Sequence, residues 1–281
     1  FQVPGLVLPG LTLVVSPLIS LMNDQVERLH SLGIGAATLP AGTTDSGINT
    51  ALAQAKQGLI RFLYVSPERL ASGNFVDKLT RAGVSLIAVD EAHCVSQWGH
   101  DFRPSFLKIR LLMELLPQVP VLALTASATP QVLEDICLQL GIANASVFRQ
   151  SFFRPNLILE VQTSERPDAD AALLLQKSKG ANIVYVRSRK QAESGASSLS
   201  RLGVPAVAYH AGYAAADRSI RQRQWMDENP PTMVATTAFG MGIDKGNVRT
   251  VVHWDMPESL EAYYQEVGRG GRDGEPAVAA S

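Results

Sequence analysis

Short apolar runs rich in Val, Ile and Leu alternate along this chain with longer stretches in which apolar residues recur with helical spacing. After Pro17, for example, Met22 and Leu29 fall on one side of a helix. The pattern predicts strands over residues 12–16, 60–66, 85–90 and 119–125, and then over 156–161, 182–186, 206–210, 232–236 and 249–254.

Nearly continuous apolar strands that are joined by helices are typical of a parallel sheet with helices on both faces. Crossovers between such strands are right-handed. A polar segment that contains proline, "RQSFFRPN" at residues 149–156, separates the two series of strands. The sequence therefore predicts an α/β protein with two parallel-sheet domains, residues 1–150 and 151–281, and a cleft between them.

Composition narrows the classes of function. The chain has 281 residues, of which 46% are hydrophobic, and its formal net charge is −1. That balance argues against a globally basic surface for nucleic acid but allows local basic stripes. The two cysteines, Cys94 and Cys137, have neither zinc-ligand nor disulfide-framework spacing, which favours a reducing cytoplasm. No apolar run reaches the roughly 18 residues of a membrane span and no signal peptide is recognisable, so no membrane partner is expected.

Two adjacent acids, Asp90 and Glu91, end an apolar run within the segment "VDEAHCVSQWGHDFRPSF". In open parallel sheets, ligands bind beyond the carboxyl ends of the strands. A carboxylate there suits Mg²⁺, which prefers oxygen ligands and keeps most of its waters. A neighbouring Glu can polarise an attacking water. We therefore expect Asp90 to hold Mg²⁺ and Glu91 to be a general base, the alternative being that both acids only face solvent.

The residues that follow the acids combine flat and cationic side chains. Trp98, Phe102 and Phe106 offer rings for unpaired bases, and such stacking is worth about 1–3 kcal/mol per base. The cationic residues among them are His100, Arg103 and Lys108. This segment is a candidate loop for single-stranded nucleic acid. The alternative is that the rings belong to the core, which we expect for Phe106 because a helix follows it.

Two turns after predicted strands carry residues that suit anions. Backbone N–H groups at a helix N-terminus attract phosphate, so Ser16, Pro17 and Leu18 in "VVSPLISL" are candidates for a DNA phosphate. The alternative is an ordinary turn with Pro17 as the first helical residue. In "SPERL", Ser66 has the same chemistry, and Arg69 either contacts a phosphate or forms a surface ion pair.

Two Gly-rich segments lie in the second half of the chain. "AFGMGIDKG" has Gly240 and Gly242 at the first spacing of a dinucleotide fingerprint, but a strand follows it instead of a helix, which excludes a Rossmann site. "QEVGRGGRDG" places Gln265, Arg269 and Arg272 on or just after a helix. Such arginines can approach a phosphate flexibly, and a measured arginine finger accelerates phosphoryl transfer by about 10³–10⁵-fold. The alternative is exposed arginines in surface ion pairs.

Taken in chain order, these segments resemble the superfamily 2 helicases, and the aromatic segment is similar to the aromatic-rich loop of the RecQ family of DNA helicases. "TLVVSPLISLMNDQV" resembles motif Ia of that family, "YVSPERL" the next motif, "VDEAH" motif II and "ALTASAT" motif III. "IVYVRSRKQ" and "AYHAG" resemble the motif IV region, "VATTAFGMGIDKGNVRTVVHWDMP" motif V and "YYQEVGRGGRDG" motif VI. The resemblance runs from residue 1 to about residue 277.

The resemblance implies two RecA-like domains that bind ATP and Mg²⁺ between them and couple hydrolysis to 3′–5′ unwinding of DNA, single-stranded or forked, in repair and recombination. It implies catalytic roles for Asp90, Glu91, Arg269 and Arg272, with Arg272 as the arginine finger. The implied nucleotide contacts are Asp90, His93, Gln265, Gly242, Asp244, Arg269 and Arg272. The implied DNA contacts are Ser16, Pro17, Leu18, Ser66, Arg69, Trp98, Phe102, Arg103, Ser188, Arg189, Thr236 and Thr237. Of these, Trp98, Phe102 and Arg103 would sense DNA, and His93 would bridge the nucleotide and motif III unless it is a structural histidine.

The phosphate-cradling segment G-x-x-x-x-G-K-[S/T] does not occur in residues 1–281. In the family that the chain resembles, it lies just before a segment like "FQVPGL". We therefore expect a first domain that is truncated at its N-terminus and little ATP hydrolysis by these residues alone. Zinc is expected only in a C-terminal module outside them.

Three other functions stay open at this stage. The chain could be another superfamily 2 motor, such as an RNA helicase or a translocase, although the aromatic segment speaks against it. It could be a non-catalytic fragment that binds single strands. A nucleotide-binding metabolic enzyme would need a cofactor fingerprint that the chain does not supply. Protein partners are not indicated by the sequence.

Overall fold

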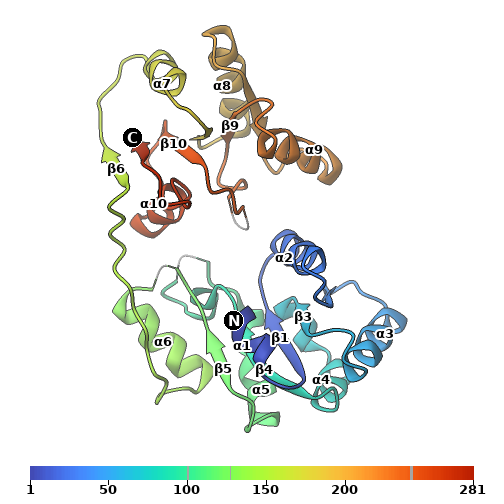
Figure 1. Cartoon of the computed structure of the whole chain (residues 1–281). Helices are drawn as coiled ribbons and strands as arrows, with labels where there is room; N and C mark the ends of the chain where they lie inside the picture. Colours follow the sequence, from blue (N-terminus) through green and yellow to red (C-terminus); the bar gives the residue numbers. More distant parts are fainter. Residues whose placement is uncertain (100, 127, 241–242) are drawn as a thin grey trace. The chain divides into compact units, whose positions relative to one another are not determined.

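The computed structural model describes residues 1–281 except 100, 127, 241 and 242. The chain divides into two compact units, residues 1–147 (unit 1) and 148–281 (unit 2). Strands and helices alternate along both units, as Figure 1 shows. Each unit has one parallel sheet, which confirms the predicted α/β class with two parallel-sheet domains.

Unit 1 contains a sheet in the order β2-β3-β1-β4-β5. Its strands are β1 (Leu11–Val15), β2 (Ala36–Leu39), β3 (Phe62–Val65), β4 (Val84–Val89) and β5 (Val121–Ala123). Its α-helices are α1 (Gln2–Val7), α2 (Ile19–Ser31), α3 (Asp45–Lys56), α4 (Gly73–Thr80), α5 (Lys108–Leu115) and α6 (Pro130–Leu140), and its 3₁₀ helices are η1 (Pro67–Ala71), η2 (Ala92–Val95) and η3 (Pro104–Leu107). The first and fourth strands are central neighbours, so their carboxyl ends meet at one edge of the sheet.

The core of unit 1 lies on both faces of this sheet. Leu13 and Val15 pack with residues of α3, α4, α5 and α6, whereas Val14 packs with Met22 and Leu29 of α2 on the opposite face. Successive residues of a strand point to opposite faces. A strand covered on both faces must therefore be apolar throughout, which explains the unbroken run at residues 13–15.

Unit 2 contains a parallel sheet in the order β6-β11-β10-β7-β9-β8. Its strands are β6 (Leu157–Glu160), β7 (Ala181–Tyr185), β8 (Ala206–Tyr209), β9 (Thr232–Ala235), β10 (Val248–His253) and β11 (Ala277–Ala280). Its helices are α7 (Pro167–Gln176), α8 (Arg189–Arg201), α9 (Ala215–Met226) and α10 (Leu260–Val267). Ile183 and Val184 again belong to separate clusters on the two faces.

Two strands were not predicted from the sequence. β2 reads AATL and β11 reads AVAA. Both are four residues long and rich in Ala, which is depleted in strands. Sheet neighbours fix them instead, because β2 pairs with β3 and β11 lies between β6 and β10.

Candidate functional site

The predicted acids lie at the carboxyl end of β4, beside the end of the central strand β1 of unit 1. Asp90 directly follows β4, and its N–H donates to the carbonyl of Val15 at the end of β1 (2.9 Å). The hydroxyl of Ser16 donates to Asp90 Oδ2 (3.3 Å), and the Glu91 N–H donates to Asp90 Oδ1 (3.1 Å). Both carboxylate oxygens of Asp90 are therefore oriented by donors from neighbouring strand ends.

Burial raises the pKa of the Asp90 carboxyl. The Glu91 N–H and the Ser16 hydroxyl act in the opposite direction, because they stabilise the charged form, but they do not outweigh the loss of solvent. A nearby cation would favour the ionised form. The site thus holds a carboxylate whose charge is only partly compensated by the protein.

Glu91 has an unusual backbone, with φ of 50° in the left-handed region. Its Oε2 lies 3.3 Å from Nδ1 of His93. His93 is buried, and the same ring nitrogen lies 3.1 Å from Oγ1 of Thr125, just after β5. His93 therefore connects the acids with the segment that resembles motif III. Its contact with a nucleotide stays a prediction.

The aromatic loop, residues 96–106, is anchored at its start by α6. The buried Ser96 hydroxyl donates to Asp135 Oδ2 (2.7 Å), and the Gln97 N–H donates to the same oxygen (3.1 Å). Trp98 is 67% exposed and Phe102 half-buried, whereas Phe106 is fully buried. Phe106 is a core residue, as expected. The first two rings are available to a ligand, and His100 lies outside the described residues.

Arg103 makes two contacts that tie the aromatic loop to the first strand turn. Its Nη1 donates to the carbonyl of Pro17 (3.0 Å), and its Nη2 donates to Asp101 Oδ2 (3.0 Å). The side chain is 28% exposed. Arg103 therefore joins the loop to the turn that Ser16 connects to Asp90. Its direct contact with DNA stays a prediction.

The turn after β1 differs from one of the two sequence-based interpretations, the one in which Pro17 begins the helix. Helix α2 begins at Ile19 with Leu18 as N-cap, so Pro17 is not the first helical residue. Ser16 is 1% exposed and its hydroxyl is directed to Asp90. The Ser16 side chain is therefore not offered to a phosphate, and the predicted contact of this turn's backbone with a DNA phosphate stays a prediction. A phosphate at this turn would meet the backbone at Leu18.

The expected surface role of Arg69 is wrong. Arg69 is 8% exposed, and its Nη2 donates to the backbone carbonyls of Pro40, Ala41 and Thr43. It holds the connection between β2 and α3 and has too little exposed surface for a phosphate. Ser66 is likewise buried, at 3%, so its side chain does not offer a surface contact.

In unit 2, the two arginines after α10 hold the segment that resembles motif V. Arg269 is 7% exposed, and its Nη1 donates to the carbonyl of Gly240. Its Nε is buried without a hydrogen-bond partner among the described residues. A Cβ at Gly240 would lie 2.6 Å from Arg269 Nη2, so the guanidinium fits only because residue 240 has no side chain. The prediction that Arg269 is a flexible side chain that can approach a phosphate is therefore wrong.

Arg272 is more accessible than Arg269. Its side chain is 37% exposed, and Nη1 donates to the carbonyl of Ile243 (2.9 Å) and to Asp244 Oδ1 (3.3 Å). Burial, followed by the charge of Arg269, lowers the pKa of Arg272. Two cations close together make this part of unit 2 favourable for an anion.

The remaining predicted residues of unit 2 lie at the ends of strands and helices. Ser188 is the N-cap of α8, in a capping box with Gln191, and the exposed Arg189 is the first residue of that helix. Thr236 and Thr237 directly follow β9. Gln265 lies in α10, half-buried. Gly242 lies outside the described residues.

Sequence analysis missed Arg154 and Asn156, which bind the loop that carries Arg272. They were assigned to a polar segment between domains. The signal that could have found them is their position just before a strand, β6, that pairs with β11 at the end of that loop. Because β11 itself was not predicted, this pairing was not visible.

No helix among the described residues is long and apolar enough to span a membrane. Within the same residues there is no cluster of three or more His, Cys, Asp or Glu side chains that could hold a metal.

Two family descriptions match the chain. Residues 6–136 match the DEAD/DEAH box helicase family, and residues 166–274 match the helicase conserved C-terminal domain. The first covers most of unit 1 and includes Asp90 and Glu91. The second covers most of unit 2 and includes Arg269 and Arg272.

The chain is similar over nearly its whole length to curated DNA helicases. It is 45% identical to the ATP-dependent DNA helicase RecQ of Bacillus subtilis (strain 168), a match that covers 98% of this chain and 47% of the relative. It is 43% identical to that of Pasteurella multocida (99% and 44%) and 44% identical to ATP-dependent DNA helicase Q5 of Mus musculus (99% and 30%). The chain thus spans about half the length, or less, of these relatives.

Solved helicase structures share the fold at low sequence identity. The Mycobacterium smegmatis helicase Lhr bound to ssDNA and AMP-PNP gives a TM-score of 0.67 at 20% identity and covers 96% of this chain and 39% of that one. Saccharomyces cerevisiae Dbp5 bound to RNA and ADP BeF3 gives 0.71 at 17% identity, with 97% and 71% covered. At such identities the match concerns the fold alone.

Proposed function

We propose that this chain, which belongs to the RecQ-like DEAD/DEAH box helicases, is the motor core of an ATP-dependent DNA helicase. The observation that carries the proposal is the pair of acids directly after β4, in which Ser16 at the end of β1 orients Asp90, and His93 contacts Glu91. Hydrolysis needs a metal-binding carboxylate beside a group that can accept a proton from water. Asp90 is suited to the first of these tasks and Glu91 to the second.

Mg²⁺ and ATP fit the chemistry of these residues. Asp90 offers oxygen ligands at a rigid strand end, a neighbouring hydroxyl comes from Ser16, and the raised pKa of Asp90 marks a charge that a cation would stabilise. Bound there, Mg²⁺ would neutralise phosphate charge. Glu91 would orient the attacking water and accept its proton at Oε, while His93 keeps that carboxylate in place.

The arginines of unit 2 suit the same nucleotide. Arg272 is accessible, and Arg269 is buried beside it with Nη1 on a backbone carbonyl. We assign Arg272 to the transferring phosphoryl group and Arg269 to the support of the segment 240–244. Gln265 and Asp244 are assigned to the nucleotide, and Gly242 is proposed from its place in the sequence alone.

We assign the contacts with DNA to accessible residues of both units. Trp98 and Phe102 offer rings for bases, and the turn at Leu18 offers backbone groups for phosphate. In unit 2, Ser188, Arg189, Thr236 and Thr237 lie at strand and helix ends, where phosphate contacts are common. We propose single-stranded and forked DNA as substrates, 3′–5′ movement, and a cytoplasmic location.

The test uses a chimera, because residues 1–281 contain no G-x-x-x-x-G-K-[S/T] segment. The phosphate-loop segment of the Bacillus subtilis relative is joined in front of Phe1. We expect ATP hydrolysis that single-stranded DNA stimulates, unwinding of forked DNA, and unwinding of a duplex with a single 3′ tail but not of one with a single 5′ tail. The unfused chain is the control. Equal stimulation by RNA and unwinding of RNA duplexes would overturn the DNA assignment, and a folded chimera without hydrolysis would overturn the motor assignment.

A further inference from the structure

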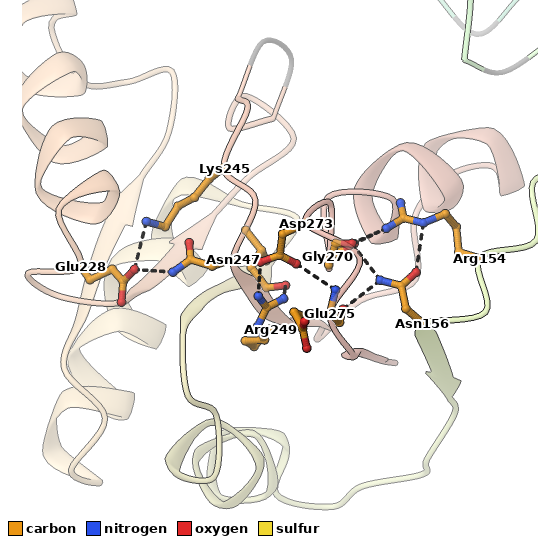
Figure 2. A network of polar contacts seen from close by, with 11 residues as sticks. Arg154, Asn156, Glu228, Lys245, Asn247, Arg249, Gly270, Asp273 and Glu275 are labelled. Carbon is orange, nitrogen blue, oxygen red and sulfur yellow. Dashed lines mark hydrogen bonds and ion pairs between the residues drawn. The ribbon is translucent and has the colours of Figure 1, made fainter.

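The loop that carries Arg272, residues 268–275, is bound by two residues from the start of unit 2. Arg154 Nη2 donates to the carbonyls of Gly270 (3.1 Å) and Gly271 (2.6 Å). Asn156 Nδ2 donates to the carbonyls of Gly271 and Glu275 (both 2.8 Å). Figure 2 shows both side chains directed at the loop, with Arg154 Nε donating to Asn156 Oδ1 (3.3 Å).

The loop has little rigidity of its own. It contains Gly268, Gly270, Gly271 and Gly274, and glycine loses more conformational freedom on folding than any other residue. Gly271 has φ of 56°, and a Cβ there would lie 2.5 Å from the Glu275 carbonyl and 2.6 Å from Asn156 Nδ2. The turn is therefore tight, and outside contacts add to its own hydrogen bonds, from the Gly274 N–H to the Gly271 carbonyl and from the Glu275 N–H to Asp273 Oδ1 (both 3.1 Å).

The opposite side of the loop is held by β10 and the segment before it. Arg249 Nη2 pairs with Asp273 Oδ2, as Figure 2 also shows. The Gly271 N–H donates to the carbonyl of Val248 (2.8 Å). Arg272 thus projects from a loop that is bound on both sides, and its own Nη1 reaches the carbonyl of Ile243.

The charge of Arg154 is not needed to bind this loop. The acceptors that it contacts, two carbonyls and one amide oxygen, are neutral. A third guanidinium near Arg269 and Arg272 adds repulsion, which contributes to the lowered pKa of Arg272 after burial and Arg269. Clustered cations are favourable where a polyanion binds. The carbonyl contacts of Arg154 resemble those of the structural Arg69, so it is the clustering with Arg269 and Arg272 that favours a phosphate here.

We propose that Arg154 and Asn156 are positioning residues that fix Arg272 for phosphoryl transfer. The inference rests on the proposed function and deepens it. Arg154 and Asn156 act through the backbone of residues 270–275 and do not touch the nucleotide themselves. A displacement of about 1 Å in a catalytic group costs about 10²-fold in rate, so loosening the loop lowers turnover more than it lowers binding of ATP.

The kinetic test compares Arg154→Met with Arg221→Met in the hydrolysing chimera. Arg221 is a matched control, because its Nη1 also donates to a backbone carbonyl of unit 2, that of Ala208 (3.2 Å). We expect Arg154→Met to lower kcat by about 10²-fold with little change in KM for ATP, and Arg221→Met to leave kcat unchanged at a similar Tm. Arg154→Lys keeps an N–H donor on a slightly shorter side chain, so we expect it to retain more of kcat than Arg154→Met.

A double-mutant cycle distinguishes positioning from general destabilisation. If Arg154 acts through Arg272, then Arg154→Met adds nothing to the loss caused by Arg272→Ala. Additive losses, or a kcat that falls only with the folded fraction, overturn the proposal. Asn156→Ala should follow the same pattern as Arg154→Met.

A second readout is independent of hydrolysis and uses the whole 281-residue chain. Arginine labelled with ¹⁵N gives an Nε–H signal for Arg272, which is assigned by its loss in Arg272→Lys. We expect Arg154→Met to shift and broaden that signal and Arg221→Met to leave it unchanged. An unchanged signal overturns the positioning role, whatever the chimera does. A chimera that does not hydrolyse ATP overturns the proposed function instead.

Discussion

At the scale of residues, the two adjacent acids after β4 have different surroundings. Asp90 receives donors on both oxygens, from Ser16 and from the Glu91 N–H. Glu91 has a left-handed backbone at φ of 50°, which is strained for a residue with a side chain, and its carboxylate is directed to His93. Titratable neighbours with unlike environments carry out unlike tasks in active sites. The strain at Glu91 is consistent with a position set by function.

Glu91→Gln should abolish turnover without abolishing binding. The amide has nearly the same size but cannot accept a proton from water, so we expect kcat of the chimera to fall by about 10²–10⁴-fold, with KM for ATP little changed. Steady-state ATP hydrolysis with single-stranded DNA measures both. The control is Glu114→Gln, an exposed glutamate that pairs with Arg110 on α5. A variant that keeps half of the wild-type rate would exclude Glu91 as the base.

Asp90→Asn should make unit 1 more stable at neutral pH while it removes activity. The folded-state pKa of Asp90 is raised, so the folded protein binds its proton more readily than the unfolded chain does. The ionised Asp90 carboxylate therefore lowers the free energy of unfolding. This loss is absent below the unfolded pKa of about 3.9, grows as pH rises towards the folded pKa, and is complete above the folded pKa. We expect a higher Tm for the variant at pH 7 to 8 in Mg²⁺-free buffer, with the gain shrinking towards pH 4.

Asp168→Asn gives the opposite sign and serves as the control for that experiment. A hydrogen bond from Ser198, at 2.8 Å, is the main cause of the lowered pKa of Asp168. Its contribution to stability is present above the unfolded pKa and is lost as pH falls through the folded one. The variant should have a lower Tm at neutral pH and match the wild type only under strongly acidic conditions. Differences of equal sign for both variants would contradict the assigned pKa directions.

At the scale of elements, the segment 240–244 and the loop 268–275 depend on each other. Arg269 and Arg272 each donate to a carbonyl of that segment, those of Gly240 and Ile243. The arginines therefore do not move as free side chains. These two hydrogen bonds link Gly240 and Ile243, which resemble part of motif V, to the arginines that resemble part of motif VI.

Gly240→Ala tests this link. The added Cβ would lie 2.6 Å from Arg269 Nη2 and 3.0 Å from its Cζ, so the guanidinium must leave its place. Overpacking of this kind costs about 1–3 kcal/mol, and we expect a lower Tm together with a loss of kcat. Thermal denaturation and ATP hydrolysis by the chimera measure the two effects. Gly73→Ala on α4, where an added Cβ meets nothing within 4 Å, is the control. Unchanged kcat at reduced Tm would show that the link is structural only.

Sequence patterns identified those features of the structure that residues close together in the sequence determine. The strand end at Asp90, the core position of Phe106 and the place of Arg269 after a helix all follow from periodicity over a few residues. Long-range contacts decided the rest. Ser16 is directed to an acid 74 residues away, and Arg69 to carbonyls 26 to 29 residues away. No local pattern distinguishes such a buried arginine from an exposed one.

At the scale of the whole molecule, charge does not explain an affinity for DNA. The formal net charge is −1, so no overall field attracts a polyanion. The proposed DNA binding must therefore come from a few local cations and from stacking. The candidates are the partly exposed Arg103 and the exposed Lys108 and Arg189, with Trp98 as the exposed ring. Because Arg69 is buried, it does not belong to this set.

These two sources of affinity differ in their response to salt. Each phosphate contact to a single strand contributes about −0.7 to the slope of log K against log salt concentration, so at most three contacts predict a slope of about −2. We expect Arg189→Gln to make the slope shallower by about 0.7. Trp98→Ala should weaken binding by about 1–3 kcal/mol at every salt concentration and leave the slope unchanged, because stacking releases no counterions.

Fluorescence anisotropy of a labelled oligonucleotide, measured from low to high salt, gives both quantities for the 281-residue chain. Lys56→Gln on α3, an exposed lysine at the end of a helix, controls for loss of charge alone. A slope near −5 in the unsubstituted chain would mean about seven phosphate contacts. That exceeds what the proposed DNA-contact residues supply, so a basic surface other than this one would have to be sought.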